Sequence, residues 1–165
     1  MATSRLRRFL LPDLNRKFIF RLLLVALTAV VVFTQILIPL RIEGKSMEPT
    51  YDDGGFNFCW RGRYLFSAPE RGDVVVIRFA GQRVMLLKRI IGLAGDTIEF
   101  RNGALFVNGA WVKEPYVRSP SDWNLAPRKV EPGKVYVVGD NRTVHMDRHH
   151  FGQVEQDRII GGLLW

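Results

Sequence analysis

Two side chains in the middle of the chain have the chemistry of a nucleophile and its base. Ser46 lies in the stretch IEGKSMEPT, and a serine hydroxyl attacks a carbonyl only when a neighbouring group takes its proton. Lys88 lies in VMLLKRII, where strand alternation places it on one face with Val84, Leu86 and Ile90. Burial among aliphatic side chains would lower the pKa of its amine from about 10.4 toward neutrality. The two residues are therefore candidates for a serine–lysine pair, if the fold brings them together.

Each residue also has a simpler interpretation, and a histidine is an alternative base. Serine commonly bonds its own backbone in turns and caps, and a lysine stem can cover apolar surface while its charge reaches water. The histidines, His145, His149 and His150, lie within six residues of one another near the end of the chain. From the sequence alone, one of them could approach Ser46.

No metal site or disulfide is expected. His145 and His149 are four residues apart, but the chain has no HExxH arrangement, and the glycines around them favour a loop. Cys59 is the only cysteine, which excludes an intrachain disulfide and a cysteine-based zinc site.

A third polar segment follows a short apolar run near the end of the chain. In VVGDNRTVHMDRHHFG, residues 137–152, a predicted buried strand leads into Gly139, Asp140 and Asn141. A carboxylate and an amide at such a turn can fix a loop through local hydrogen bonds. This loop either supports a site or is a charged surface turn.

The elements that would position these residues begin with a basic tail and an apolar run. Residues 1–21 carry a net charge of +5 of the total of +8, so the rest of the chain has no basic block of the kind that binds nucleic acid. Residues 22–40 are uncharged, and as a helix they would span roughly 28 Å, close to the hydrocarbon thickness of a bilayer. A buried helix and a cleavable signal peptide are the alternatives, but the run is long for a signal peptide and its exit, IPLRIEG, has no small-x-small site. We expect a transmembrane anchor that ends near Pro39, with residues 1–21 in the cytoplasm and residues 41–165 outside the inner membrane.

Residues 41–165 have the pattern of a single, mostly antiparallel β domain, a sheet assembly or a barrel. Residues 73–79 and 84–91 are β-rich and are separated by AGQR, which predicts a hairpin. Residues 97–134 form a hairpin-rich part in which Asn102-Gly103 and Asn108-Gly109 predict type I′ turns. The prolines of residues 113–134 favour a loop in the second half of this part. Residues 135–138, which follow it, are predicted to form a buried strand.

Aromatic and basic residues alternate in FNFCWRGRYLF, residues 56–66. This composition suits a membrane interface, where rings lie at headgroup depth and cations meet phosphates. The alternative is that half of the rings belong to the core of a strand.

Three segments, in this order after an anchor, resemble the type I signal peptidases (leader peptidases), membrane serine proteases with a serine–lysine dyad. EGKSMEPT is similar to the nucleophile box, LLKRIIGLAGD to the base box, and GDNR, residues 139–142, to the start of the last box. The resemblance implies Ser46 as nucleophile, Lys88 as base, the backbone at Ser46 and Gly44 near the oxyanion, and no cofactor. It also implies exported preproteins as substrates, cut after small residues in a small-x-small pattern on the outer face of the membrane.

The last box departs from the family pattern. The supporting residues would be Gly139, Asp140, Asn141, Arg142, His145 and Asp147. The family typically has a lysine-orienting serine at the place of His145, whereas the aspartate is matched by Asp147, and Arg148 and His149 replace a serine and an arginine. His145 could replace the missing serine.

Self-cleaving repressor-type proteins also resemble this family, but they lack an anchor. A catalytically silent, membrane-tethered β domain that binds signal peptides or partners is the alternative function, and the oligomeric state stays open.

Overall fold

The computed structural model describes residues 15–80, 84–119, 121–149 and 152–164. The chain divides between Leu37 and Ile38 into two compact units, which are described separately. Several predicted features lie outside the described residues: most of the basic tail, the centre of the AGQR connection, and His150.

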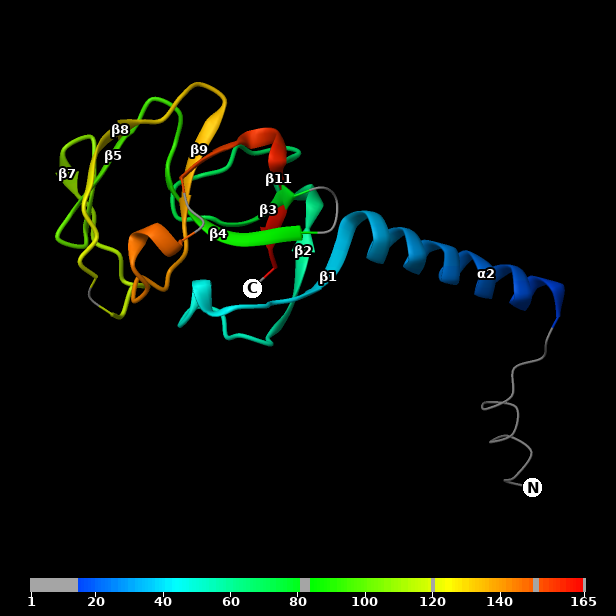
Figure 1. Cartoon of the computed structure of the whole chain (residues 1–165). Helices are drawn as coiled ribbons and strands as arrows, with labels where there is room; N and C mark the ends of the chain where they lie inside the picture. Colours follow the sequence, from blue (N-terminus) through cyan, green and yellow to red (C-terminus); the bar gives the residue numbers. More distant parts are fainter. Residues whose placement is uncertain (1–14, 81–83, 120, 150–151, 165) are drawn as a thin grey trace. The chain divides into compact units, whose positions relative to one another are not determined.

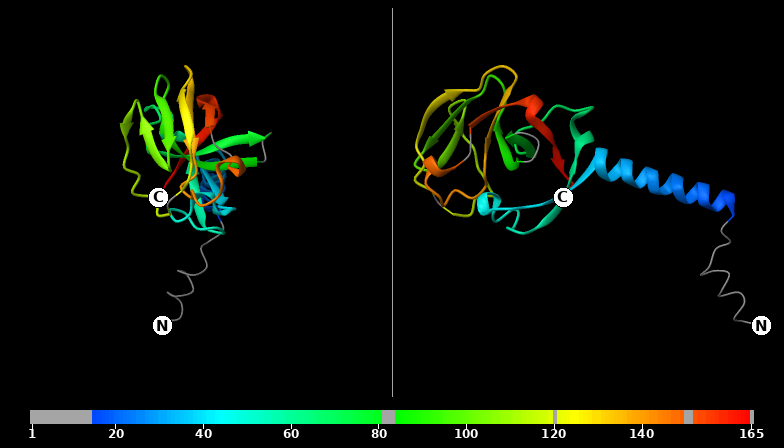
Figure 2. Two further views of the ribbon diagram at one scale, coloured as in Figure 1. Left: turned by 60° about the vertical axis from the view of Figure 1, so that its left-hand side comes forward. Right: turned by 45° about the vertical axis from the view of Figure 1, so that its right-hand side comes forward.

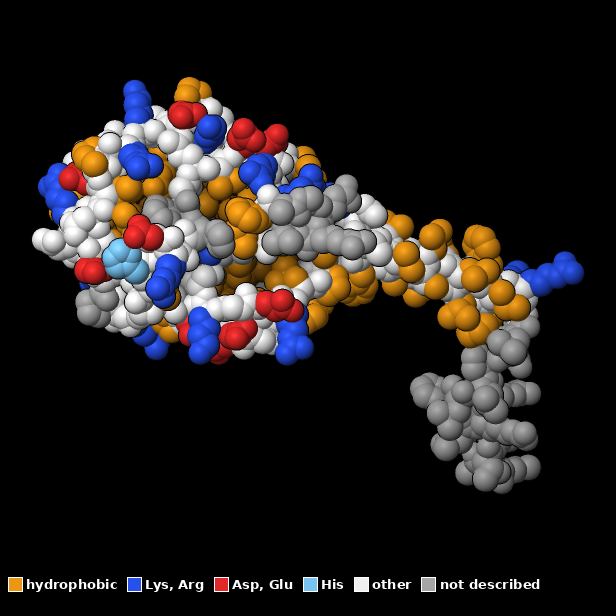
Figure 3. All heavy atoms as spheres, viewed as in Figure 1, with side chains coloured by type: hydrophobic (Ala, Val, Ile, Leu, Met, Phe, Trp, Pro, Cys, Tyr) orange, Lys and Arg blue, Asp and Glu red, His pale blue; other side chains and the backbone are white. Residues whose placement is uncertain are grey.

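The first unit contains helix α2, Arg16–Val31, which a π-helical turn, η1 (Val32–Ile36), continues. Asn15 caps the helix by accepting a hydrogen bond from the Phe18 N–H at 2.8 Å. None of its side chains is buried, and Figure 3 shows them as a hydrophobic surface. By length and composition, Arg16–Ile36 could cross a membrane. A helix of these residues is about 31 Å long, as the bilayer core requires.

The helix ends sooner than the apolar run. Residues 37–41 form strand β1, Leu37–Arg41, although the sequence favoured helix to about Pro39. Proline disfavours helical backbone in the residue before it, here Ile38, so the chain becomes extended at this point.

The second unit consists of antiparallel sheets, which confirms the predicted mainly β fold (Figure 1). A seven-stranded sheet has the order β1-β2-β11-β3-β4-β9-β10, and a four-stranded sheet has the order β7-β6-β5-β8. The further strands of the large sheet are β2 (Phe56–Trp60), β3 (Val74–Ala80), β4 (Val84–Gly92), β9 (Lys134–Val138), β10 (Gly152–Glu155) and β11 (Ile159–Leu163). The small sheet contains β5 (Thr97–Arg101), β6 (Ala104–Val107), β7 (Ala110–Trp111) and β8 (Leu125–Lys129).

The predicted hairpins are confirmed. Strands β3 and β4 pair antiparallel, with Val75 opposite Lys88. Asn102-Gly103 joins β5 to β6 and Asn108-Gly109 joins β6 to β7, and all four residues have positive φ angles, between 47° and 80°. Both residues of a type I′ turn need this conformation.

The prediction of a loop over residues 113–134 is wrong in one part, because β8 (Leu125–Lys129) pairs with β5. Its Pro127 suggested a break, since proline cannot donate to a ladder. Strand β8 lies at the edge of the small sheet, however, and an edge strand tolerates proline.

Strand β9 is buried on both faces and separates two apolar clusters. Val135 and Val137 pack with Val75, Ile77 and Ile90 in one cluster. Tyr136 and Val138 pack in the other, which lies between the sheets around Trp123. Two buried faces explain the continuous apolar run of this strand. They also fix the start of the polar loop that follows at Gly139.

Strand β2, whose ribbon can be followed in the two views of Figure 2, has an aromatic outer face. Asn57 and Cys59 are buried, whereas Phe56 and Trp60 are exposed. Further along the same segment, Phe66 is 99% exposed. The alternation leaves these rings out of the core, as an interfacial role requires.

Candidate active site

Backbone hydrogen bonds hold Ser46 in a turn between β1 and β2. Ile42 and the Gly54–Gly55 backbone exchange two hydrogen bonds of 2.8 Å. Gly44 then turns the chain with a φ of 88°, and a short 3-10 helix, η2 (Lys45–Met47), follows. The Met47 side chain is buried, so it anchors the serine from the next position.

The Lys88 amine donates a hydrogen bond of 2.8 Å to the Ser46 Oγ. The two residues are 42 positions apart in sequence, and the curl of the large sheet brings the Ser46 turn against β4. Lys88 is only 3% exposed, and its cross-strand partner Val75 is fully buried. The structure thus places the predicted nucleophile and base in direct contact.

Burial lowers the pKa of Lys88 from 10.5 to about 8, and the carboxylate of Asp140 partly opposes this shift. An ammonium loses hydration when apolar side chains cover it, so its neutral form becomes more favourable. A pKa near 8 leaves roughly a tenth of the amine neutral at pH 7. That neutral fraction can accept the proton of the serine.

Arg89 points to the opposite face of β4 and binds Asp140 through two hydrogen bonds, from Nε at 2.8 Å and Nη2 at 2.6 Å. Thr50, just after the Ser46 turn, donates a third hydrogen bond to the same carboxylate at 2.5 Å. The Asp140 side chain is fully buried. The Asp140 side chain therefore connects three elements: β4, which carries Lys88, the turn that carries Ser46, and the loop after β9.

Gly139 and Asn141 hold the backbone of Ser46. A Cβ atom on Gly139 would lie 2.3 Å from the Ser46 carbonyl oxygen, so only glycine allows this close approach. The Asn141 N–H donates to that oxygen at 3.0 Å, and the Asn141 side-chain amide donates to the Lys45 carbonyl at 2.9 Å. The loop after β9 thus fixes the position of Ser46.

Arg142 is 2% exposed and anchors this loop to the small sheet. Its Nε donates to the Gly139 carbonyl at 2.7 Å, and its Nη2 to Glu114 at 2.7 Å. Glu114 also accepts from the Tyr116 hydroxyl at 2.8 Å, and the Arg89 guanidinium lies 4.0 Å above the Tyr116 ring. Sequence analysis missed Glu114 and Tyr116 because they lie in an irregular, proline-containing segment.

His145 and Asp147 lie away from the dyad. Their side chains are 63% and 81% exposed and form an ion-pair contact of 3.2 Å with each other. The described residues contain no hydrogen bond between His145 and Lys88. The other histidine in the described part, His149, packs edge-on against Trp123 and lines a cavity of about 210 Å³ that Lys88 also lines. Within the described ranges, no three His, Cys, Asp or Glu side chains are grouped to hold a metal ion.

Ser46 and Gly44, the two residues predicted to lie near an oxyanion, differ in their backbone contacts. Ser46 lies in the first turn of η2, where backbone N–H groups have no acceptor within the helix. The Gly44 N–H, by contrast, donates to the Asp53 carboxylate at 2.8 Å. Of the two predicted oxyanion groups, the Gly44 N–H is thus already bonded, and Gly44 supplies the conformation of the turn.

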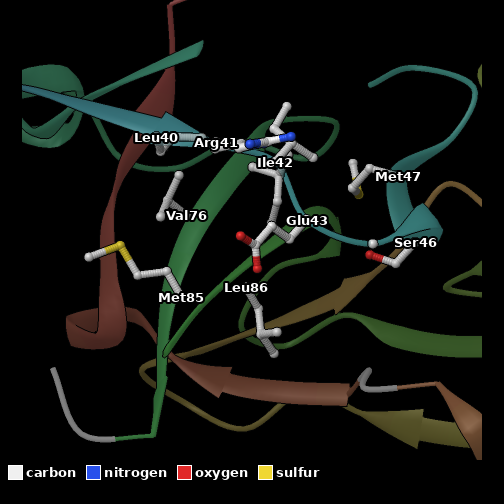
Figure 4. A pocket seen from close by; sticks show the side chains of 11 residues that line it. Leu40, Arg41, Ile42, Glu43, Ser46, Met47, Val76, Met85 and Leu86 are labelled. Carbon is white, nitrogen blue, oxygen red and sulfur yellow. The ribbon is translucent and has the colours of Figure 1, made fainter. Parts of the chain in front are cut away.

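A cavity of about 310 Å³ opens beside Ser46 (Figure 4). One wall is residues 40–44, the other is residues 85–87 of β4, and Val76 and Met47 complete it. Along this part of β4 the neighbouring strand is missing, because β9 pairs only from Arg89 onward. Within the described strands, the backbone of residues 85–87 therefore faces the cavity as a free sheet edge.

Comparison with known proteins gives consistent matches. Residues 15–164 match the family described as "Signal peptidase, peptidase S26". A signal peptidase I of Bacillus amyloliquefaciens is 37% identical over 134 residues, which cover 74% of this chain and 69% of that protein. Signal peptidase I V of Bacillus subtilis strain 168 is 33% identical over 147 residues, covering 81% and 87%. A solved signal peptidase I of Enterococcus faecalis has a TM-score of 0.48 and 28% identity over 59% of this chain and 97% of that one.

Proposed function

Because the chain belongs to the signal peptidase S26 family, we propose that it is a membrane-anchored serine endopeptidase that removes signal peptides from exported preproteins. The observation that carries this proposal is the 2.8 Å hydrogen bond between the Lys88 amine and the Ser46 hydroxyl. An activated serine needs a base within hydrogen-bond reach, and Lys88 is such a base.

The proposed reaction depends on the protonation state of the Lys88 amine. Neutral Lys88 takes the Ser46 proton while the serine oxygen bonds to the scissile carbonyl carbon. The resulting ammonium then protonates the leaving amine, the carbon–nitrogen bond breaks, and an acyl-enzyme remains. Lys88, neutral again, takes a proton from a water whose oxygen bonds to the acyl carbon. The bond from that carbon to the Ser46 Oγ then breaks, the Lys88 ammonium returns its proton to the serine oxygen, and the acid leaves. The Ser46 N–H stabilises the oxyanion in both steps, a contribution commonly worth about 3 kcal/mol per donor.

The cavity suits an extended peptide. A peptide strand lying between residues 40–44 and 85–87 would complete the free edge of β4 through main-chain hydrogen bonds. Alternate side chains of that peptide would point into the cavity, whose limited size favours small ones. Family membership implies preprotein substrates, and this geometry supports cleavage after a small-x-small pattern.

The first unit supports anchoring by a single transmembrane helix, with residues 1–21 as a cytoplasmic tail. We place the β domain, residues 41–165, on the outer face of a bacterial plasma membrane, because the basic excess of the chain precedes the helix. The exposed aromatic residues of β2 suit contact with lipid headgroups.

Cleavage of a purified preprotein tests the proposal. The full chain in detergent micelles is incubated with a preprotein bearing an Ala-x-Ala site, beside the variants Ser46→Ala and Lys88→Met. We expect cleavage after the second alanine by the wild type and none by either variant. An inert wild type that still binds the signal peptide would instead identify the catalytically silent binding domain.

A further inference from the structure

Among the residues that the structure describes, one carboxylate in the cavity beside Ser46 has no ion-pair partner and does not belong to the dyad. Glu43 lies three residues before Ser46, between the buried Ile42 and Gly44. Figure 4 shows its side chain directed into the cavity toward Leu86. Most of the surrounding side chains are apolar, and Glu43 is the acidic one among those that line the cavity.

The Glu43 carboxylate forms no ion pair within the described part of the chain. Among the described side chains, no cation lies within ion-pair distance of it. Arg41 also lines the cavity, but its guanidinium lies close to Gly54, where a Cβ atom would be 3.7 Å from Nη2. The carboxylate that acts on Lys88 is that of Asp140. Within the described residues, Glu43 therefore neither takes part in an ion pair nor acts on Lys88.

We propose that Glu43 is a specificity-determining residue that selects substrates with a cationic side chain shortly before the cut. The inference rests on the proposed function and names a feature of its substrates. A lysine or arginine of the substrate would supply the missing partner, whereas an acidic side chain would be repelled.

The spacing indicates which substrate residue is selected. Glu43 and Ser46 line the same cavity, along whose wall of residues 40–44 the proposed extended peptide would run, so the selected residue lies shortly before the bond that Ser46 attacks. The first and third positions before the cut take small residues in the proposed pattern. Side chains at the second and fourth positions point to the opposite, exposed face of the peptide, and Glu43 is itself exposed beside the buried Ile42, so the cation belongs at one of these two positions.

Matched peptides test the proposal. Each has alanine at the first and third positions before the cut, and lysine, glutamine or glutamate at the second or fourth. We expect kcat/KM for the best lysine peptide to exceed that of its glutamate counterpart by about five- to tenfold at low salt, as for a charge pair exposed on one side. The ratio falls toward one in Glu43→Gln, stays in the control Asp52→Asn, and decreases as salt screens the pair.

Binding to the full-chain Ser46→Ala variant in neutral detergent separates this inference from the proposed function. The same lysine-over-glutamate preference in Kd, lost when Glu43→Gln is added, supports the role of Glu43 even if the wild type cleaves nothing. Efficient cleavage with equal kcat/KM for the lysine and glutamate peptides overturns it. A preference that persists in Glu43→Gln overturns it as well.

Discussion

The Arg89 guanidinium and the Asp140 carboxylate form a two-fold hydrogen-bonded ion pair between neighbouring elements, with the Asp140 side chain fully buried. Arg89 follows Lys88 on β4, and Asp140 follows Gly139, which contacts the backbone of Ser46. The pair therefore fixes the distance between the two residues of the dyad from the opposite face of the strand.

Loss of the Asp140 charge should affect both stability and the base. In Asp140→Asn, the partly buried Arg89 loses its counter-charge, so we expect the free energy of unfolding to fall by about 2–4 kcal/mol. Because Asp140 raises the pKa of Lys88, the acid limb of the pH–rate profile should move to lower pH. Denaturant unfolding and kcat/KM against pH measure the two effects.

The matched control is Glu131→Gln, which removes an exposed ion pair with Lys134. It should change stability by no more than about 1 kcal/mol and leave the pH profile in place. An acid limb that moves to higher pH in Asp140→Asn would contradict the electrostatic role of Asp140.

Cleavage by the wild type should increase with pH through the titration of Lys88. Only the neutral amine accepts a proton, and its pKa is about 8. The neutral fraction grows from roughly a tenth at pH 7 to nine tenths at pH 9, so kcat/KM should rise nearly tenfold and then level off. A limb centred near pH 6.5 would instead indicate a histidine as the base.

The sequence carried more information on Ser46 and Lys88 than on the residues that surround them. Strand alternation placed Lys88 among aliphatic side chains, and its burial is confirmed. Contact with Ser46 could not follow from alternation, because it depends on how the large sheet curls, and only the family resemblance joined the two segments. The Asn-Gly turns were predictable since their backbone preference is local.

The supporting contacts were less predictable. Glu114 meets Arg142 across 28 residues that include an edge strand and irregular chain, and no periodic pattern marks such a contact. Strand β8 was missed because its pairing depends on its place at the sheet edge rather than on its composition. The place of the family's lysine-orienting serine suggested His145, but this residue is exposed beside Asp147.

The buried Lys88 amine should lower the free energy of unfolding of the wild type at neutral pH. The depressed pKa means that the unfolded chain binds more protons than the folded chain between about pH 8 and 10.5. Stability therefore rises with pH in this window, and below it the buried ammonium destabilises the fold. Lys88→Met removes that charge, so we expect the free energy of unfolding at pH 7 to increase by roughly 1–3 kcal/mol.

Urea unfolding at pH 7 and at pH 10 measures the effect. The gain in Lys88→Met should be large at pH 7 and small at pH 10, and Lys134→Met, a change at a more exposed lysine, should show no such gain. A loss of stability in Lys88→Met at both pH values would show that packing, rather than charge, dominates at this position.

Glu114 should support the catalytic loop through Arg142. Its carboxylate is the counter-charge of a guanidinium that is 1% exposed, and it also holds the Tyr116 hydroxyl. In Glu114→Gln the amide keeps some hydrogen bonds but not the charge, so we expect a loss of about 2–4 kcal/mol in unfolding free energy. Because Arg142 also donates to the Gly139 carbonyl, the loop behind Ser46 should loosen and kcat should fall severalfold, with little change in KM. Glu114→Asp, which keeps the charge, should recover part of both losses. Unchanged stability and kcat in Glu114→Gln would show that Arg142 does not need this partner to hold the loop.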